Sequence, residues 1–356
     1  MAPAFVRANI RAMSGYTPGE QPGPGLRVVK LNTNENPFPP SPRVVDAIHQ
    51  IDPELLRRYP QPLADSFRRA AAKLHGVSPD MIVCGNGSDD LLTIATRCFV
   101  PPGGTLAAPE PTYSLYPVLA QLEDARYVGV PWPSDFALPI DALCAAKPQA
   151  IYLANPNAPT GTFVSPDSVA QLAQKCRGAL LIDEAYADFA DENCLRLLKD
   201  HENVVITRTL SKAYSLAGLR FGYAIAQPHV VEQMVKVKDS YNCDAVSIVA
   251  ATAALADQES ARKSWDYIRA TRSRLIGELE SLGWTCLPSQ ANFILATVPG
   301  GRGREAYLGL KDQGILVRWF DQPRLRDKIR ITVGASQENN ALLGGIKSLQ
   351  LAVKAA

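Results

Sequence analysis

"ALLIDEA", residues 179–185, is a short apolar run that ends in two carboxylates. Its length and aliphatic content predict a strand buried on both faces, as in a parallel sheet covered by helices. Asp183 closes the run, at the end of the strand where α/β proteins bind ligands, and a carboxylate there needs a cationic partner. Because side chains alternate along a strand, Asp183 and Glu184 are expected to point to opposite faces.

Similar apolar runs lie on both sides of this one along the chain. Most are rich in β-forming residues and predict strands buried on both faces, at residues 81–85, 104–109, 125–131, 150–156, 203–210 and 220–226. Helical patterns precede or separate them, at residues 41–51, 63–76, 88–99, 112–123 and 165–176. This alternation predicts an α/β large domain, residues 41–250, in which helices flank a mostly parallel central sheet.

The two ends of the chain have other patterns. Residues 1–40 are rich in Pro and Gly and predict an extended arm, of which the run 27–38 is tied down as a segment of a small domain. Residues 251–356 combine helical stretches with short strand-like runs, at 261–283, 291–298, 304–314, 315–320, 329–334 and 338–356. They predict a smaller α+β C-terminal domain.

Composition excludes several classes of protein. The formal net charge of +2 gives no footprint for nucleic acid or for a membrane surface. No apolar stretch approaches the ~20 residues of a membrane span, and the N-terminus lacks the apolar core of a secretory signal. Seven cysteines without a C-x-x-C and four histidines without an H-x-x-x-H suggest neither a disulfide framework nor a metal site. We expect reduced thiols and a cytoplasmic location.

Two stretches near predicted strand ends carry glycine or proline in functional patterns. In "VCGNGSDDLL", residues 83–92, a strand leads through two glycines into a helix that starts at Ser88, and the backbone N–H groups of such a start can hold an anion. "LANPNAPTGTF", residues 153–163, has two X-Pro bonds in one short loop, which can hold cis peptide bonds.

In the stretch "TLSKAYSLAGLR", residues 209–220, Lys212 and the final Arg220 are the two basic residues. Hydroxyl side chains flank Lys212, and it follows the predicted strand 203–210. Burial or nearby cations lower the pKa of a lysine and turn it into a nucleophile. Together with Asp183, the glycine turn and the proline loop, Lys212 predicts a site for a cofactor that has a phosphate, a basic ring nitrogen and an aldehyde.

With these motifs the chain resembles the histidinol-phosphate aminotransferase family, which belongs to the class I/II, fold-type I enzymes that use pyridoxal 5'-phosphate (PLP). The shared segments run almost from end to end: "KLNTNENPFPPSP", "RYPQP", "GNGSDD", "PTYSLY", "NPNAPTG", "DEAYADF", "RTLSKAYSLAGLRFGY", "ANF", "GILVR" and "RITVG". The Ser-Lys block with its downstream arginine is the most specific of them.

The resemblance implies a role for each matching residue. Lys212 would hold PLP as a Schiff base and move the proton, Asp183 would pair with the ring nitrogen, and Tyr186 would bind the ring oxygen. Tyr113 would stack on the ring. Further cofactor contacts are implied for Gly87, Ser88, Asp89, Asn155, Asn157, Thr209, Ser211 and Arg220. Tyr59 would reach the cofactor phosphate of the neighbouring subunit, which implies a homodimer with shared active sites, and the substrate would meet Tyr16, Arg318 and Arg330.

One position departs from the family pattern. The family carries an asparagine before Pro-Thr-Gly that contacts the ring oxygen, and this chain has Ala158 there. Asn155 or Asn157 is expected to compensate, with Asn155 favoured because it lies at the strand end.

The resemblance implies amino transfer between glutamate or 2-oxoglutarate and histidinol phosphate or imidazole acetol phosphate. Two other activities stay open on the same fold: an aromatic amino acid aminotransferase and a decarboxylase of a phosphorylated amino acid. A noncatalytic binding module also stays open, in which Lys212 would not hold the cofactor.

Overall fold

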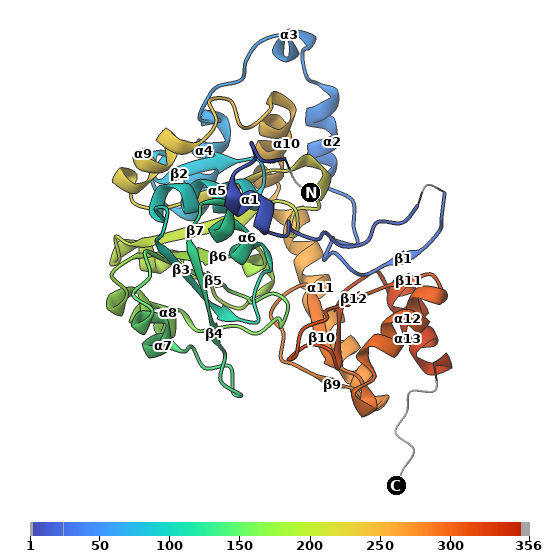
Figure 1. Ribbon diagram of the computed structural model, residues 1–356. Helices are drawn as coiled ribbons and strands as arrows, with labels where there is room; N and C mark the ends of the chain where they lie inside the picture. Colours follow the sequence, from blue (N-terminus) through green and yellow to red (C-terminus); the bar gives the residue numbers. More distant parts are fainter. Residues whose placement is uncertain (1–2, 24, 350–356) are drawn as a thin grey trace.

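A seven-stranded sheet forms the centre of the computed structural model, which describes residues 3–23 and 25–349 (Figure 1). The strands follow the order β2-β8-β7-β6-β5-β3-β4. β8 runs in the opposite direction to all the other strands, which are parallel to one another. Their bounds are β2 Ile82–Gly85, β3 Thr105–Glu110, β4 Arg126–Pro131, β5 Ala150–Ala154, β6 Ala179–Asp183, β7 Val204–Thr209 and β8 Gly222–Ile225. The parallel strands therefore end at one edge of the sheet, where α/β proteins bind ligands.

Helices cover both faces of the sheet and bury it. One face packs against α5 (Ser88–Phe99), α6 (Leu115–Leu122) and α9 (Pro228–Val237), and the other against α4 (Asp65–His75), α8 (Pro166–Lys175) and α10 (Ala245–Ala256). The remaining helices of this part are α1 Ala8–Ala12, α2 Pro42–His49, α3 Pro53–Leu56 and α7 Ile140–Ala145, with 3-10 turns η1 Pro79–Met81, η2 Ala187–Phe189, η3 Leu195–Lys199 and η4 Ala217–Leu219.

The long helix α11 (Gln258–Ser281) leads from the large domain into the strands of the smaller domain. Its antiparallel sheet has the order β12-β13-β10-β9; α11 packs against β9 and β10, α12 packs against β12 and β13, and α13 packs against α11 and α12. The bounds are β9 Thr285–Cys286, β10 Phe293–Thr297, η5 Pro299–Gly301, α12 Gly303–Asp312, β12 Arg318–Trp319, β13 Lys328–Thr332 and α13 Ser336–Ser348.

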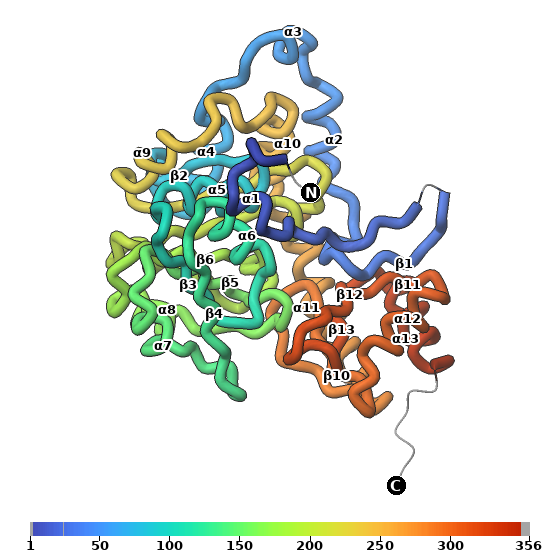
Figure 2. The backbone as a smooth tube through the Cα atoms, viewed as in Figure 1, coloured from blue at the N-terminus to red at the C-terminus, as the bar shows by residue number. Residues whose placement is uncertain are grey.

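The N-terminal arm joins the two domains. Its first turn, α1, is held to the end of α6, where Asn9 Nδ2 donates to the Gln121 carbonyl at 2.9 Å. Figure 2 shows the arm then crossing to the small domain. There β1 (Val29–Lys30) pairs in parallel with β11 (Ile315–Leu316). The run 27–38 is thus fixed by strand pairing to the small domain.

Several local predictions can be compared with the elements. α2 starts after Ser41, whose side chain accepts from the Arg43 amide, and α4 ends at Gly76 in the left-handed region. The prediction that strand 125–131 is buried on both faces is wrong: β4 is an edge strand and most of its residues are partly or fully exposed. The predicted closing helix ends at Ser348, and residues 350–356 of that prediction lie outside the described residues.

Candidate active site

A cavity of about 470 Å³ lies at the carboxyl edge of the central sheet. The large domain, the arm and the small domain all contribute to its walls. Residues predicted from sequence that line it are Tyr16, Ser88, Asp89, Tyr113, Asp183, Tyr186, Thr209, Ser211, Lys212, Arg220, Arg318 and Arg330. The fold therefore gathers, in one place, side chains that are up to 314 positions apart in the chain (330 − 16).

Lys212 lies half-buried just after β7, and its Nζ donates to the carbonyl oxygen of Thr33 at 2.8 Å. Burial lowers the pKa of this amine to about 8, and the positive charge of Arg330 acts in the same direction. A substantial fraction of Lys212 is therefore neutral near pH 8, which is the form that attacks a carbonyl carbon.

Asp183 ends β6 on the face covered by α5, α6 and α9. Its carboxylate accepts hydrogen bonds from the Tyr116 hydroxyl at 3.0 Å and from the Ala185 amide at 3.2 Å, both neutral groups. Burial raises its pKa to about 6. A buried carboxylate bonded only by neutral donors is suited to a cationic or N–H partner that enters the cavity.

The start of α5 forms one corner of the cavity. Gly87 precedes the helix with φ of 87°, and a Cβ added there would lie 2.6 Å from Nη2 of Arg220. Arg220 Nη1 donates to Ser211 Oγ at 3.1 Å, and its Nη2 lies 3.7 Å from an Asp89 carboxylate oxygen. A helix N-terminus, a guanidinium and a serine hydroxyl thus converge on a space without a side chain at Gly87, which is suited to a phosphate.

The small domain supplies a second cationic wall. The guanidinium of Arg330 lies over two aromatic rings, 5.2 Å from the centre of Phe293 and 5.5 Å from that of Phe320. Its Nη2 donates to the Asn32 carbonyl at 2.9 Å, whereas its Nε is buried without a hydrogen-bond partner. The guanidinium of Arg318 also lies over Phe320, 5.4 Å from the centre of its ring. An anion entering the cavity would satisfy this unpaired donor.

Comparison with known proteins decides the family. The family described as aminotransferase class I and II matches residues 27–346. Histidinol-phosphate aminotransferase 1 of Nostoc sp. is 45% identical over 345 residues, which are 97% of this chain and 98% of the relative. Histidinol-phosphate aminotransferase of Rhodopirellula baltica is 45% identical over 95% of this chain and 93% of its own.

The chain belongs to the class I and II aminotransferases, within the histidinol-phosphate aminotransferase family. The fold agrees: the crystal structure of histidinol-phosphate aminotransferase from Sinorhizobium meliloti in complex with pyridoxal-5'-phosphate superposes with a TM-score of 0.87. That structure is 28% identical and the alignment covers 98% of this chain and 99% of that chain. This aminotransferase thus has the expected fold-type I architecture.

The structure does not bring Asn155 and Asn157 of this aminotransferase into the cavity. The side chain of Asn155 bonds both the amide and the carbonyl of Val164 at 2.9 Å, which closes the proline loop. Asn157 Nδ2 donates to Thr160 Oγ1 at 2.7 Å and to the Pro111 carbonyl at 3.1 Å. Both side-chain amides thus donate to other atoms of the protein, and Ala158 lines the cavity instead. The expectation that either asparagine replaces the missing one is therefore corrected.

Two tyrosines predicted to act at the site differ in their positions. The ring of Tyr16, on the arm, meets Tyr113 edge to face, with centroids 5.9 Å apart. Tyr59 lies outside the cavity of its own chain; it is 81% exposed and stacks on Tyr241 at 4.5 Å.

Sequence reasoning missed Asn34 and Tyr116, which contact Tyr186 and Asp183 respectively. Tyr116 lies three residues after Tyr113 at the start of α6, a helical spacing that could have suggested a shared direction. Asn34 gave no comparable signal, because it contacts residues far along the chain.

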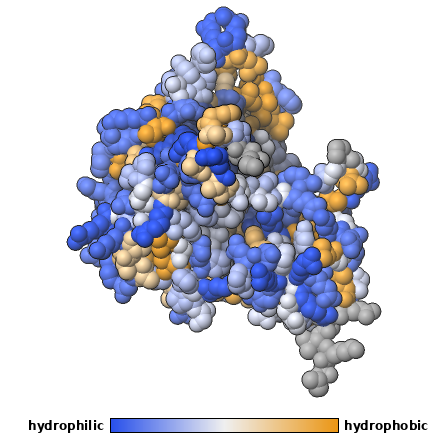
Figure 3. All heavy atoms as spheres, viewed as in Figure 1, coloured by the Kyte–Doolittle hydropathy of each residue, from blue (hydrophilic) through white to orange (hydrophobic). Residues whose placement is uncertain are grey.

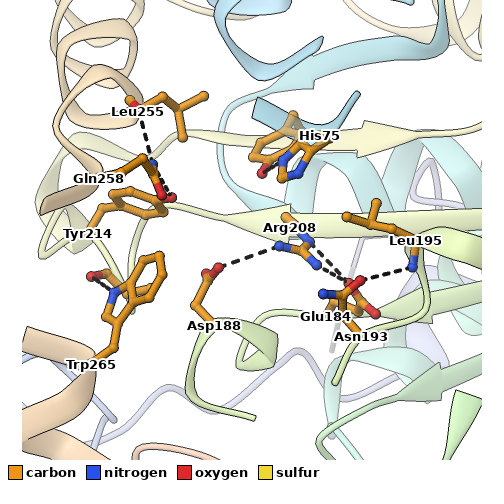
Figure 4. Close-up of polar contacts among 12 residues, drawn as sticks. His75, Glu184, Asp188, Asn193, Leu195, Arg208, Tyr214, Leu255, Gln258 and Trp265 are labelled. Carbon is orange, nitrogen blue, oxygen red and sulfur yellow. Dashed lines mark hydrogen bonds and ion pairs between the residues drawn. The ribbon is translucent and has the colours of Figure 1, made fainter. Parts of the chain in front are cut away.

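A buried polar network was also missed, on the sheet face opposite to Asp183 (Figure 4). Arg208 Nη2 lies 2.6 Å from a Glu184 carboxylate oxygen, and Arg208 Nη1 lies 3.4 Å from Asp188. On the same face, His75 Nε2 lies 2.7 Å from the Tyr223 hydroxyl, and burial with the nearby charge of Arg208 lowers the pKa of His75 to about 3. The network ties β6 to β7 just behind the cavity.

Within residues 3–23 and 25–349, no helix is both long and apolar enough to cross a membrane. The same part of the chain has no group of three or more His, Cys, Asp or Glu side chains that could hold a metal ion.

Proposed function

We propose that this aminotransferase uses pyridoxal 5'-phosphate to move an amino group between glutamate or 2-oxoglutarate and histidinol phosphate or imidazole acetol phosphate. The observation that carries the proposal is the cavity itself, which holds a half-buried amine with a lowered pKa, a buried carboxylate, an anion corner and a second cationic wall. The names of the near full-length relatives support histidinol phosphate as one substrate, and glutamate or 2-oxoglutarate follows from the family resemblance.

The residues present fit the cofactor. The Gly87–Ser88 helix start, Arg220 and Ser211 suit its phosphate, because the absence of a side chain at Gly87 lets the Arg220 guanidinium lie against the helix start. Asp183 suits the ring nitrogen, since its carboxylate is buried and bonded only by neutral donors. When bound, pyridoxal phosphate supplies an aldehyde and a protonated ring that withdraws electrons from the α-carbon of an amino acid.

Lys212 Nζ has two tasks in this proposal: it holds the cofactor between turnovers, and it takes and returns the proton of the α-carbon. A pKa of about 8 suits both tasks, because an amine with a pKa near the working pH gains and loses a proton readily. Tyr113, whose hydroxyl donates to Asp89 at 3.1 Å, presents its ring as a wall of the cavity. Thr209 supports the turn that carries Lys212, since its Oγ1 accepts from the Ser211 amide.

Arg330 and Arg318 would bind the distal anion of either substrate. A carboxylate and a phosphate both present oxygen pairs that a guanidinium can bond with two N–H groups. The Nε of Arg330 has no hydrogen-bond partner among the described residues, and contacts with Phe293 and Phe320 hold the guanidinium in place, so it can bind such an anion. Tyr16, 40% exposed on the arm, lies where it can cover the bound substrate.

We infer that two copies of the chain pair and share their sites. Tyr59 and its neighbours expose a cluster of large hydrophobic side chains near α2 and α3, made up of Val45, Leu55, Leu56, Tyr59 and Tyr241. Figure 3 shows hydrophobic residues gathered over α2. An exposed apolar cluster of this kind is typical of a protein–protein interface. It supports a homodimer in which Tyr59 reaches the phosphate corner of the partner.

Chemical trapping tests the cofactor site. Purified protein loaded with pyridoxal phosphate is reduced with borohydride, digested and analysed by peptide mass spectrometry, and we expect the label on Lys212. Lys212→Ala should remove the label, whereas Lys263→Ala, an exposed lysine paired with Glu259, should keep it. A label on any other lysine contradicts the proposal.

A panel of donors then tests the substrates. Glutamate and histidinol phosphate should each bleach the visible band of the loaded protein and release the matching keto product. Aromatic amino acids as the better donors would favour the aromatic aminotransferase, and release of CO2 from a phosphorylated donor would favour a decarboxylase.

A further inference from the structure

Asn34 lies in the arm, directly beside the cavity, and its backbone is held from several sides. The residue is buried and adopts a left-handed conformation with φ of 56°. Its amide donates to Thr332 Oγ1 at 3.0 Å, and its carbonyl accepts from Asn292 Nδ2 at 3.0 Å. Both partners belong to the small domain. Asparagine is one of the few residues other than glycine that adopts this conformation readily.

The side chain of Asn34 is oriented by two hydrogen bonds. Its Oδ1 accepts from Thr332 Oγ1 at 3.4 Å, and its Nδ2 donates to the Tyr186 hydroxyl oxygen at 2.9 Å. The Tyr186 ring is held edge to face against Phe293, with centroids 5.0 Å apart. Because the hydroxyl oxygen of Tyr186 accepts from Asn34, its own O–H proton is free to donate elsewhere, and Tyr186 lines the cavity.

The neighbouring wall of the cavity lacks a donor where the family pattern has one. Ala158 lines the cavity there, and the amides of Asn155 and Asn157 donate to Val164, Thr160 and Pro111 instead. Of the two donors that the resemblance assigns to the cofactor's ring oxygen, this chain retains the Tyr186 hydroxyl. The direction in which the Tyr186 O–H group points therefore matters more here than in a chain with an asparagine at position 158.

We propose that Asn34 is a positioning residue that fixes the Tyr186 hydroxyl with its proton directed at the cofactor's ring oxygen. This inference rests on the proposed function, since it requires pyridoxal phosphate in the cavity. A hydrogen bond donated to the ring oxygen stabilises negative charge there. It therefore lowers the pKa that is obtained from the pH dependence of the bound cofactor's visible absorption band, called below the pKa of the visible band. Loss of the Asn34 amide frees the hydroxyl to rotate, weakens the donation and raises that pKa.

A double-mutant cycle of Asn34→Gly and Tyr186→Phe tests the proposal. Glycine keeps the left-handed backbone and removes only the side chain. In the wild-type background, N34G should raise the pKa of the visible band by about 0.5–1 unit, the range expected for one hydrogen bond. In the Y186F background, the same substitution should shift it by much less, because no hydroxyl remains to be positioned.

Asn32→Gly is the matched control. Asn32 is also buried beside the cavity, but its Nδ2 donates to the Glu20 carbonyl, so its effect should be the same with or without the Tyr186 hydroxyl. Equal N34G shifts in the two backgrounds would overturn the positioning role, as would the absence of a shift in both.

Asn34→Asp provides a second variant that keeps size and backbone conformation. Its carboxylate accepts where the amide donated, so the Tyr186 proton turns away from the cavity. The negative charge of the introduced carboxylate acts in both backgrounds, so only the part of the shift that vanishes with Y186F measures positioning. A wild-type protein that shows no visible band with pyridoxal phosphate overturns both this inference and the proposed function. A normal band without coupling between Asn34 and Tyr186 overturns the inference alone.

Discussion

At the scale of single residues, Asp183 stabilises the proposed cofactor complex at the expense of the empty protein. Burial raises its pKa to about 6, compared with 3.8 for an ordinary aspartate. The folded protein therefore binds this proton more tightly than the unfolded chain does. The charged Asp183 carboxylate therefore destabilises the folded protein. This effect is absent at pH values below the pKa of the unfolded chain, and it is complete once the pH rises above the pKa of the folded protein.

We expect Asp183→Asn to stabilise the cofactor-free protein by about 1–3 kcal/mol at pH 7.5 and by progressively less as the pH falls toward 4. The same substitution should lower transamination strongly, because a neutral amide does not hold the proton on the ring nitrogen. Urea unfolding of the cofactor-free protein across this pH range measures the first effect.

Tyr116→Phe is the control, since it removes a donor to the carboxylate and should destabilise the protein at pH 7.5. Equal stability of D183N and wild type at all pH values would contradict the argument.

Some residues of the candidate site could be identified from local sequence and others could not. Lys212 and Asp183 follow apolar strands, and strand ends of a parallel sheet meet at one edge, so their convergence was predictable. The contact of Asn34 with Tyr186 spans 152 positions, and that with Thr332 spans 298. Such a contact depends on how the arm crosses between the domains, which no local pattern encodes. Likewise, only the structure shows that Asn155 is used within its own loop.

At the scale of elements, β6 and β7 are joined both by their ladder and by a buried ion pair. Asp183 and Glu184 are neighbours, and alternation sends the first to the cavity and the second to Arg208 on the opposite face. The pair is shielded from water, since both side chains are less than 10% exposed. Removing one partner of a buried ion pair costs more than removing both.

Arg208→Met should therefore destabilise the protein by about 3–5 kcal/mol, because Glu184 and Asp188 lose their cation. The double variant E184M/R208M should regain part of that loss, since no unpaired carboxylate remains at position 184. Urea unfolding of the two variants measures their free energies of unfolding and checks which is the more stable. A double variant that is less stable than R208M alone would contradict the account.

The sequence predicted the strands best where both faces of the strand are buried. The runs that became β5, β6 and β7 lie inside the sheet, and their continuous apolar sequences reflect helices on both faces. β4 has a similar composition but lies at the sheet edge, and position within a sheet depends on strand order, which is a long-range property. The two-residue strands β1 and β11 are too short for any periodicity.

At the scale of the whole molecule, the proposed homodimer makes each site depend on two chains. Lys212 and Asp183 lie in the cavity of their own chain, whereas Tyr59 lies outside it with most of its surface exposed. If Tyr59 completes the partner's site, a defect at Tyr59 and a defect at Lys212 in different chains leave one complete site in the mixed dimer.

Mixing separately purified Lys212→Ala and Tyr59→Ala variants, with exchange of subunits, should therefore restore activity that neither variant has. Random exchange of equal amounts makes half of the dimers mixed, each with one intact site of two, so about one quarter of wild-type activity is expected. The matched control mixes K212A with D183N: both residues line the same cavity, so no mixed dimer regains a complete site. Recovery in the control as well as in the test would show that exchange itself restores activity, and no recovery in the test would mean that Tyr59 does not act across an interface.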